Sequence, residues 1–215
     1  MPSTHRTCTV ICLGDSITKG VRPGVEADQI YEAVLERLLR HRGLQTQVIA
    51  SGVGSEQTGG ALERFDRDVI SHRPDCVTIM YGTNDSYVYE GETKPHLTPD
   101  EYAANLRRMV RLAKTSGIQA VLMSPIPLSA TGSWMAWSPY KEEGPNCRIG
   151  AYVDAVGRVA ADEEVPIVDN YSVWMAATTG TEQTIDDLTT DGCHPNPAGH
   201  ELIARTMLPV LAGLI

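Results

Sequence analysis

The stretch that decides the fold is Cys8-Thr9-Val10-Ile11-Cys12-Leu13-Gly14-Asp15-Ser16, an apolar run that ends abruptly in a glycine and two polar residues. Short runs of apolar and β-branched residues are typical of strands buried on both faces of a sheet. A serine directly after such a strand lies at its carboxyl end, where sites form in open α/β sheets. The stretch therefore predicts the first strand of a parallel sheet and a position for chemistry.

The same alternation of apolar runs and helical patterns continues along the chain. Strands are predicted at residues 7–13, 45–50, 76–81, 118–124 and 165–169. Helices are predicted at residues 26–42, 58–71, 99–116, 147–163 and 197–212. This order indicates an α/β protein whose parallel sheet is covered by helices on both faces. Because there is no repeat, low-complexity segment or linker, we expect residues 1–215 to form a single domain.

Several helix ends carry recognisable signals. Thr98-Pro99 with Glu101 combines a cap, a first-turn proline and a capping-box partner, and Asn196-Pro197 opens the last helix in a similar way. Gly43 and Gly117 follow the ends of two helices, where a left-handed cap is expected. These signals support the predicted helix boundaries.

Bulk composition excludes several classes of function. The 215 residues carry a net charge of -9, with 42% hydrophobic and 21% charged residues, and no block of Lys or Arg. A nucleic-acid surface or stable membrane insertion is therefore not expected. Residues 1–6 are polar and contain no signal peptide, so we expect a cytoplasmic protein, or a secreted one if a leader has been trimmed.

Five cysteines are an odd number and are spread along the chain, unlike a disulfide framework. Cys8 and Cys12 are the only close pair. In a strand they would lie about 13 Å apart, at roughly 3.3 Å per residue, which is too far to bind one metal ion. We interpret them as small core residues.

Three short polar segments supply the parts of an acyl-transfer site. Ser16 is the candidate nucleophile, and Asp191-Gly192-Cys193-His194 supplies a base, His194, with Asp191 to orient it. Asn84 follows the apolar run at 76–81 and offers two uncharged donors for an oxyanion. Taken singly, each residue also fits a turn or a helix cap; it is their combination that favours catalysis. Asp15 is expected to shape the turn before Ser16.

Residues 50–60 form a glycine-rich loop after the second strand. A phosphate-binding loop is excluded because the loop lacks a Gly-Lys-Ser/Thr ending and the Rossmann spacing of glycines. A backbone donor for the oxyanion is the better interpretation, since glycines let N–H groups turn towards a ligand.

These segments resemble the SGNH, or GDSL-type, serine esterase and lipase family. Gly14-Asp15-Ser16, Gly82-Thr83-Asn84-Asp85 and Asp191-Gly192-Cys193-His194 resemble its first, third and fifth blocks, in the right order. The resemblance implies a flavodoxin-like three-layer α/β/α sandwich with five parallel strands. It also implies a triad of Ser16, His194 and Asp191, and an oxyanion hole that includes Asn84. The Gly-x-Ser-x-Gly elbow of the α/β-hydrolases is absent around Ser16.

The second block departs from the family pattern of Asn-x-Gly-x-x-Gly, because the corresponding positions are Ala50, Gly52 and Ser55. The oxyanion donors implied are the N–H groups of Ser16 and Ser55 and the Asn84 amide. Gly54 replaces Ser55 if the alignment is shifted by one residue. A serine N–H still donates, since only proline lacks one.

The sequence thus predicts an esterase that acts through an acyl-enzyme on Ser16, without cofactor or metal. No apolar segment suggests a lipid groove, so short acyl groups are expected, such as acetyl on a small-molecule or carbohydrate ester. An acyltransferase, a lysophospholipase or thioesterase, and a non-catalytic flavodoxin-like binding module remain as alternatives. The oligomeric state is left open.

The one long irregular stretch runs from Ser129 to Asn146 and carries Trp134, Trp137 and Tyr140. It follows the fourth strand, so it is expected to overhang the same edge of the sheet as Ser16. Two interpretations remain open at this point. The three aromatic rings either bind substrate as a lid or pack on the domain as a satellite core.

Overall fold

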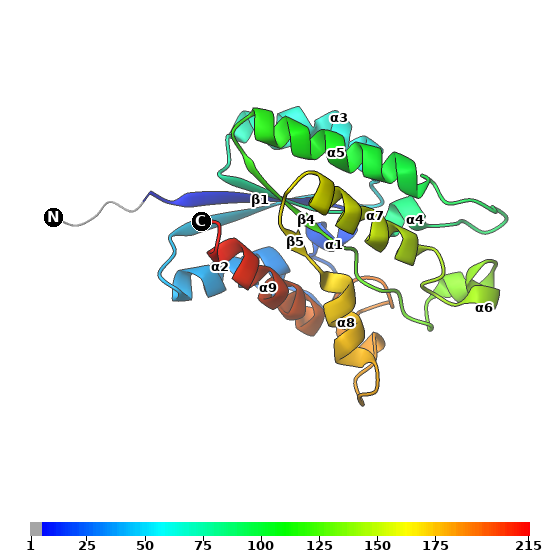
Figure 1. Cartoon of the computed structure of the whole chain (residues 1–215). Helices are drawn as coiled ribbons and strands as arrows, with labels where there is room; N and C mark the ends of the chain where they lie inside the picture. The colour runs from blue at the N-terminus through cyan, green and yellow to red at the C-terminus, as the bar shows by residue number, and fades with distance from the viewer. Residues whose placement is uncertain (1–5) are drawn as a thin grey trace.

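The computed structural model describes residues 6–215 and is built around a parallel sheet (Figure 1). The sheet has five strands in the order β2-β1-β3-β4-β5. This is the flavodoxin-like order, with a reversal of direction beside β1. The predicted fold class is confirmed. The strands are β1 (Cys8–Gly14), β2 (Thr46–Gly52), β3 (Cys76–Met80), β4 (Gln119–Met123) and β5 (Ile167–Val168).

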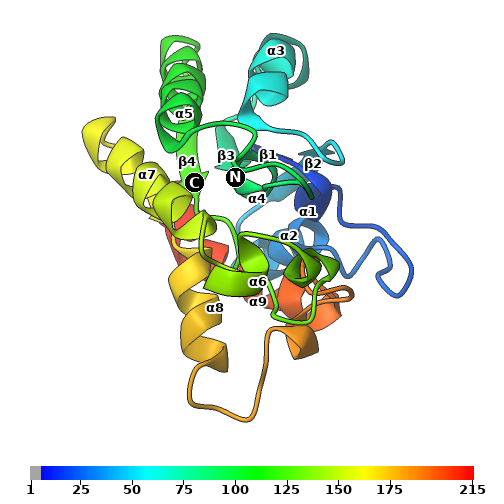
Figure 2. The ribbon, with the colours of Figure 1, turned by 90° about the vertical axis from the view of Figure 1, so that its right-hand side faces the viewer.

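Helices cover both faces of the sheet and give the three layers that were expected (Figures 1 and 2). One hydrophobic core lies between the sheet and α3, α5 and α7, and a second between the sheet and α2, α8 and α9. The strands are buried on both sides, which explains their continuous apolar runs. These helices are α2 (Tyr31–His41), α3 (Thr58–Asp68), α5 (Pro99–Thr115), α7 (Ile149–Asp162), α8 (Asn170–Thr178) and α9 (Pro197–Ala212).

The predicted helix caps are present. The Thr98 hydroxyl accepts from the Glu101 N–H at 3.2 Å, while the Glu101 carboxylate accepts from the Thr98 N–H at 2.8 Å. Asn196 accepts from two backbone N–H groups of the first turn of α9. Gly43 and Gly117 have φ angles of +82° and +73°, the left-handed conformation expected after a helix end.

The structure corrects one predicted helix start, adds one helix, and fills one stretch expected to be irregular. The helix expected at 26–42 begins only at Tyr31, because Glu26 and Gln29 close a separate turn through hydrogen bonds in both directions. Helix α8 was not predicted, since its apolar residues surround the axis instead of forming one stripe and only Asn170 and Trp174 are buried. The stretch 129–146 is not structureless, because it contains η2 (Ser133–Ala136) and α6 (Tyr140–Glu143).

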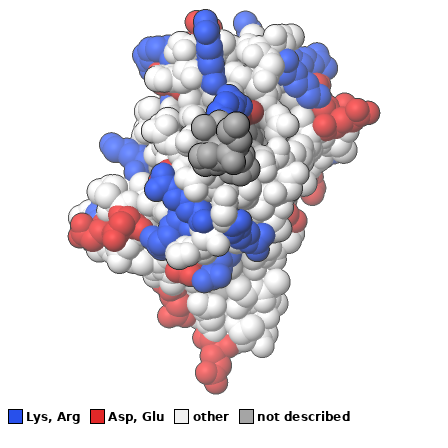
Figure 3. Space-filling view, turned by 90° about the vertical axis from the view of Figure 1, so that its left-hand side faces the viewer, with Lys and Arg blue, Asp and Glu red and all other residues white. Residues whose placement is uncertain are grey.

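The two ends of the sheet differ in what they carry. Figure 2 looks onto the carboxyl edge, where the short helices α1 (Ser16–Lys19), α4 (Thr83–Ser86) and α6 lie. Figure 3 looks onto the amino edge, where Lys and Arg side chains gather although the sequence has no basic block. Within the described residues, no helix is both long and apolar enough to cross a membrane.

Candidate active site

The fold brings Ser16, His194 and Asp191 into one hydrogen-bonded chain. Ser16 is the first residue of α1, directly after β1, and its Oγ lies 2.8 Å from His194 Nε2. His194 Nδ1 lies 2.7 Å from Asp191 Oδ2. These are the contacts of a serine nucleophile, a general base and an orienting carboxylate. The three predicted residues therefore meet across 178 positions of sequence.

Residues 191–194 form a turn, and this turn brings the His194 ring back to the Asp191 carboxylate. Asp191 Oδ1 accepts from the backbone N–H groups of Cys193 and His194, at 3.1 and 2.8 Å, and so folds the segment into a turn. Gly192 has a φ of +84°, and a Cβ there would lie 3.1 Å from the Ser129 Cβ. A glycine is needed for both reasons. The turn leaves Nδ1 facing Asp191 and Nε2 facing Ser16.

The electrostatics of the turn favour a neutral histidine. Burial lowers the pKa of His194 below its usual value, Asp191 opposes this effect, and the nearby Arg22 adds to it. Burial raises the pKa of Asp191, but hydrogen bonds from His194 outweigh it and the pKa is lowered. Asp191 is thus ionised and His194 is uncharged at neutral pH, as a general base requires.

Asn84 lies at the same edge because β3 ends in a sharp turn. Gly82, with a φ of +123°, leads directly into α4, and Asn84 is the second residue of that helix. Its Nδ2 lies 3.1 Å from Asp15 Oδ2 and 3.1 Å from the Glu56 carbonyl oxygen. The amide is thus held between Asp15, in the first block of the family motif, and Glu56, in the loop of the second block.

Asp15 shapes the turn before Ser16, as predicted. Its Oδ1 accepts from the Ile17 N–H at 2.9 Å, which caps α1, and its Oδ2 accepts from Asn84. Burial raises the pKa of Asp15 to about 7. Its carboxylate hydrogen bonds to neither Ser16 Oγ nor His194, so its role is structural.

The glycine-rich loop passes close to α1 and then turns at Ser55. A Cβ on Gly52 would lie 2.1 Å from the Lys19 backbone nitrogen, so this position requires glycine. Ser55 has a φ of +59° and lines the cavity beside Ser16. A left-handed conformation is normally taken by glycine, the residue expected there. Gly54 does not line the cavity. The placement favours Ser55 over Gly54, while the donor role itself stays a prediction.

A cavity of about 300 Å³ opens beside the triad. Of its lining side chains, Asp191 is charged and His194 is neutral, and the rest of its wall is uncharged and partly aromatic. Tyr87 and Tyr89 were not predicted, although their alternation after the Asn84 block is a signal that the sequence offers. The lining residues are Ser16, Ser55, Thr83, Asn84, Tyr87, Tyr89, Leu128, Ser133, Trp134, Asp191, Cys193 and His194.

The three aromatic residues predicted from 129–146 separate into two roles. Trp134 is buried and lines the cavity, with its Nε1 donating to the Ser129 carbonyl oxygen at 3.2 Å. Trp137 and Tyr140 do not line it. Their rings lie 6.4 and 5.7 Å from the ring of Tyr87, and both hydrogen bond to the backbone of Val88. They support the wall from behind, as a satellite core.

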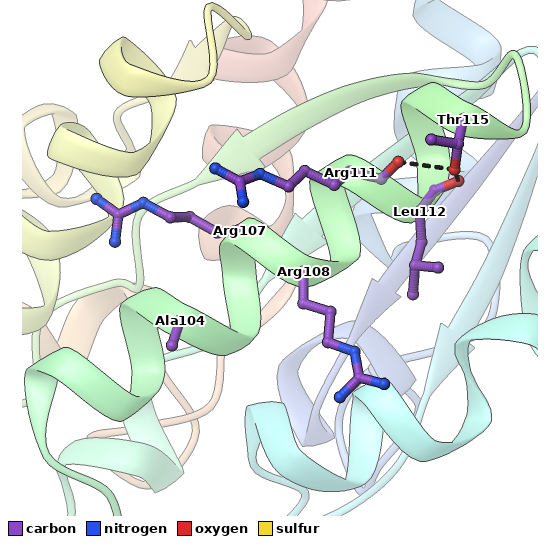
Figure 4. Close-up of a pocket in the computed structure, with 6 residues that line it drawn as sticks. All are labelled: Ala104, Arg107, Arg108, Arg111, Leu112 and Thr115. Carbon is purple, nitrogen blue, oxygen red and sulfur yellow. Dashed lines mark hydrogen bonds between the residues drawn. The ribbon is translucent and has the colours of Figure 1, made fainter.

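A larger hollow, of about 480 Å³, lies on the outer side of α5 and contains none of the predicted residues (Figure 4). Its lining includes Arg107, Arg108 and Arg111, of which two pair with carboxylates of Asp162 and Glu163 after or at the end of α7. No nucleophile or base lies there. All five cysteines are free thiols, and among residues 6–215 no three metal-binding side chains form a cluster.

The flavodoxin-like sheet and the Ser-His-Asp chain at its carboxyl edge define a class of serine-dependent α/β hydrolytic sites. The chain belongs to the GDSL-like lipase/acylhydrolase family, whose model matches residues 12–202. The family predicted from the motifs is therefore confirmed, and it is a family of carboxylic ester hydrolases.

Individual relatives are more distant. The human isoamyl acetate-hydrolyzing esterase 1 homolog is 30% identical over 147 residues, which are 64% of this chain and 56% of that protein. The match thus spans little more than half of that relative. An acetylxylan esterase of Geobacillus stearothermophilus is 28% identical over 93% of this chain and 91% of its own. The crystal structure of a lipase/acylhydrolase from Enterococcus faecalis superposes with a TM-score of 0.77, at 24% identity and 96% coverage of both chains, and supports the fold.

Proposed function

We propose that the protein is a serine esterase that hydrolyses short-chain esters through an acyl-enzyme on Ser16. The observation that carries the proposal is a chain of two hydrogen bonds. One joins Ser16 Oγ to His194 Nε2, at 2.8 Å, and the other joins His194 Nδ1 to Asp191 Oδ2, at 2.7 Å. This chain of hydrogen bonds opens onto a cavity large enough for a small acyl group. A binding module would have no need for a neutral, oriented histidine on a serine.

The chemistry proceeds in two displacement steps. His194 Nε2 takes the hydroxyl proton of Ser16 as Oγ bonds to the ester carbonyl carbon. The tetrahedral intermediate then collapses, the alcohol leaves with the proton from His194, and the acyl group stays on Ser16. Water enters, gives a proton to His194 and attacks the acyl carbon. As the second tetrahedral intermediate collapses, the bond between the acyl carbon and Oγ breaks and His194 returns its proton to Oγ, which releases the carboxylic acid and restores Ser16.

The negative charge on the carbonyl oxygen is placed against the N–H groups of Ser16 and Ser55 and the Asn84 amide. In the resting site, Asn84 Nδ2 already lies 3.1 Å from two acceptors, Asp15 Oδ2 and the Glu56 carbonyl oxygen. One of its N–H groups is therefore shared with the oxyanion as the charge develops. Donors fixed in advance in this way stabilise the transition state more than the substrate.

The substrate class proposed is an acetyl or similarly short ester. The cavity of about 300 Å³ is lined on one side by Tyr87, Tyr89 and Trp134. No lysine or arginine lines it, which disfavours an anionic headgroup. Two relatives, an isoamyl acetate-hydrolyzing esterase homolog and an acetylxylan esterase, are both named for acetate esters, which supports this class. An acetylated carbohydrate is the preferred candidate, because the matched stretch covers most of the second relative.

A panel of esters tests this proposal. Rates are compared for p-nitrophenyl acetate, butyrate and octanoate, and for isoamyl acetate and acetylated xylooligosaccharides. We expect kcat/KM to fall as the acyl chain lengthens and to be highest for the acetylated sugars. Equal rates for acetate and octanoate would contradict the short-acyl preference. EDTA is expected to leave the rates unchanged, and a loss that zinc restores would indicate metal-assisted hydrolysis instead.

A further inference from the structure

Arg64 is a charged side chain buried behind the candidate site. It lies in the middle of α3 and is only 7% exposed. Its Nε and Nη2 donate to the carboxylate of Glu56 at 2.9 and 2.7 Å, and its Nη1 donates to Asp68 at 2.9 Å. Glu56 is itself only 11% exposed. The pair is thus shielded from the solvent and forms a fixed, forked contact.

The same guanidinium joins the carboxyl ends of three strands. Nη2 lies 3.3 Å from the Gly14 carbonyl oxygen at the end of β1, and 2.9 Å from the Ser51 carbonyl oxygen of β2. It also lies 3.0 Å from the hydroxyl of Tyr81, the residue directly after β3. That hydroxyl is 2.6 Å from Glu56 Oε2. We call Arg64, Glu56, Asp68 and Tyr81 the Arg64 cluster.

The Arg64 cluster reaches the proposed oxyanion hole through Glu56. The carbonyl oxygen of Glu56 accepts from Asn84 Nδ2 at 3.1 Å, so its position sets the direction of the Asn84 amide. Ser55, the residue before Glu56, has the left-handed φ of +59° and lines the cavity. Gly14, the other backbone contact of Arg64, lies two residues before Ser16.

Buried charge in this position is not explained by stability alone. A buried ion pair is a weak source of stability, because the loss of hydration offsets the attraction between the charges. A non-glycine residue in a left-handed conformation is strained and persists only where its surroundings fix it. The Arg64 cluster lies next to such a residue and holds the loop that contains it.

We propose that Arg64 is a positioning residue for the oxyanion hole. By fixing Glu56 against the ends of β1, β2 and β3, it holds the Ser55 N–H and the Asn84 amide in the geometry that receives the oxyanion. Arg64 does not touch the substrate. The inference rests on the proposed function, and it adds a residue outside the cavity to the machinery of that reaction.

The test is Arg64→Met, which keeps an unbranched apolar stem and removes the guanidinium with its fork of donors. We expect kcat per active site to fall about 10- to 100-fold, because small displacements of catalytic donors are costly. KM should stay within about twofold, since the charge develops only in the transition state. Active sites are counted by titration with a phosphonate ester. The rate at which the phosphonate reacts should fall in Arg64→Met by about the same factor as kcat, because the phosphonate oxygen occupies the same oxyanion hole.

Arg111→Met is the matched control. Arg111 also pairs with a carboxylate of low exposure, Glu163 at 10%, but is itself 67% exposed and lies on the outer side of α5. The control is expected to lower the melting temperature without changing kcat per titrated site. The acid limb of the pH profile should be the same in wild type and Arg64→Met, because the Ser16–His194–Asp191 contacts are untouched.

Two gentler variants carry the test if Arg64→Met does not fold. Tyr81→Phe removes only the hydroxyl between Glu56 and Gly14, and Glu56→Gln removes a charge while keeping the side-chain shape. Each should lower kcat by several-fold at unchanged KM. If wild-type activity depends on Ser16 but kcat per site is unchanged in every folded variant, the positioning role of Arg64 is overturned and the proposed function stands. Equal hydrolysis by wild type and Ser16→Ala overturns the proposed function and this inference with it.

Discussion

The two parts of the cavity lining are built from different interactions. The part that contains Ser16, Ser55 and Asn84 is tied to the ends of β1, β2 and β3 by hydrogen bonds and a buried ion pair. The aromatic part stands on a small hydrophobic cluster that is separate from both main cores. Hydrogen bonds fix the direction in which a donor points, whereas apolar packing fixes the shape of a wall. We infer that the first part determines the rate of the chemistry and the second determines which ester fits.

The largest expected effect comes from the polar part. Ser16→Ala should lower kcat by more than about 10³-fold, because the nucleophile is removed while the rest of the site remains. The melting temperature should change little, since the side chain is only partly buried and, among residues 6–215, its hydroxyl hydrogen bonds to His194 alone. Kinetics and thermal unfolding on the same preparation measure both quantities. A variant that retains more than a few per cent of the activity, with contamination excluded, would rule out Ser16 as nucleophile.

Asn84→Ala is expected to have the next largest effect. Loss of one oxyanion donor typically costs on the order of 10² to 10³ in kcat. KM should change little, because the donor acts on charge that develops in the transition state. Asn105→Ala is the matched control, since Asn105 donates to Thr58 at 3.1 Å and does not line the cavity. Unchanged kcat with a raised KM would assign Asn84 to substrate positioning.

The aromatic part should respond differently, through selectivity and stability together. Trp134→Ala removes a buried indole that lines the cavity, so it should cost roughly 3–5 kcal/mol of stability. It should also raise the octanoate-to-acetate ratio of kcat/KM by about tenfold, as pocket contacts are typically worth 1–3 kcal/mol per group. Both are measured by thermal unfolding and the p-nitrophenyl ester series.

Trp137→Ala is the control that sharpens this prediction. Trp137 contacts Tyr87 and donates to Val88 at 3.0 Å, but it does not line the cavity. It should therefore lower the melting temperature with a much smaller change in selectivity. A stability loss in both variants with no change in the ester ratio would show that Trp134 is core and not part of the specificity wall.

Sequence patterns predicted the polar part better than the aromatic part, for a physical reason. Ser16, Asn84 and His194 each sit in a short motif next to a strand or turn, and parallel strands bring their carboxyl ends to one edge. The same rule placed Ser55 near them. Chemistry that depends on local turns and strand order is therefore visible in the sequence.

The remaining features depend on contacts between distant side chains. Tyr87 and Tyr89 flank Val88, whose backbone hydrogen bonds to Trp137 and Tyr140, about fifty positions away. Arg64 carries no motif and acts through Glu56, eight residues earlier, and through three strand ends. Helix α8 lacks an apolar stripe and was missed for that reason. In each case the missing information is tertiary packing.

The smallest predicted effect concerns Arg22, which does not line the cavity but hydrogen bonds to Asp191 in its polar part. Its Nη1 donates to Asp191 Oδ2 at 3.2 Å, and its charge contributes to lowering the pKa of His194, after the larger effect of burial. Because the base must be uncharged, kcat/KM should fall as the pH drops through the His194 pKa, with a midpoint below the usual histidine value of about 6.5.

Arg22→Met removes a positive charge that lowers the pKa of His194. It also removes the hydrogen bond from Arg22 to Asp191 Oδ2, so that this oxygen interacts with His194 only. The pKa of His194 should therefore rise, and the acid limb should move to higher pH. The expected shift is about 0.2–0.7 pH units, since exposed ion pairs are worth roughly 0.2–1 kcal/mol and one unit corresponds to about 1.36 kcal/mol. Activity at pH 8 should be unchanged, because His194 is neutral there in both proteins. Arg37→Met removes an exposed cation whose one hydrogen bond among residues 6–215 is to the Asp28 carbonyl oxygen, and so controls for net charge. A shift to lower pH, or an equal shift in the control, would mean that Arg22 does not tune the base through Asp191.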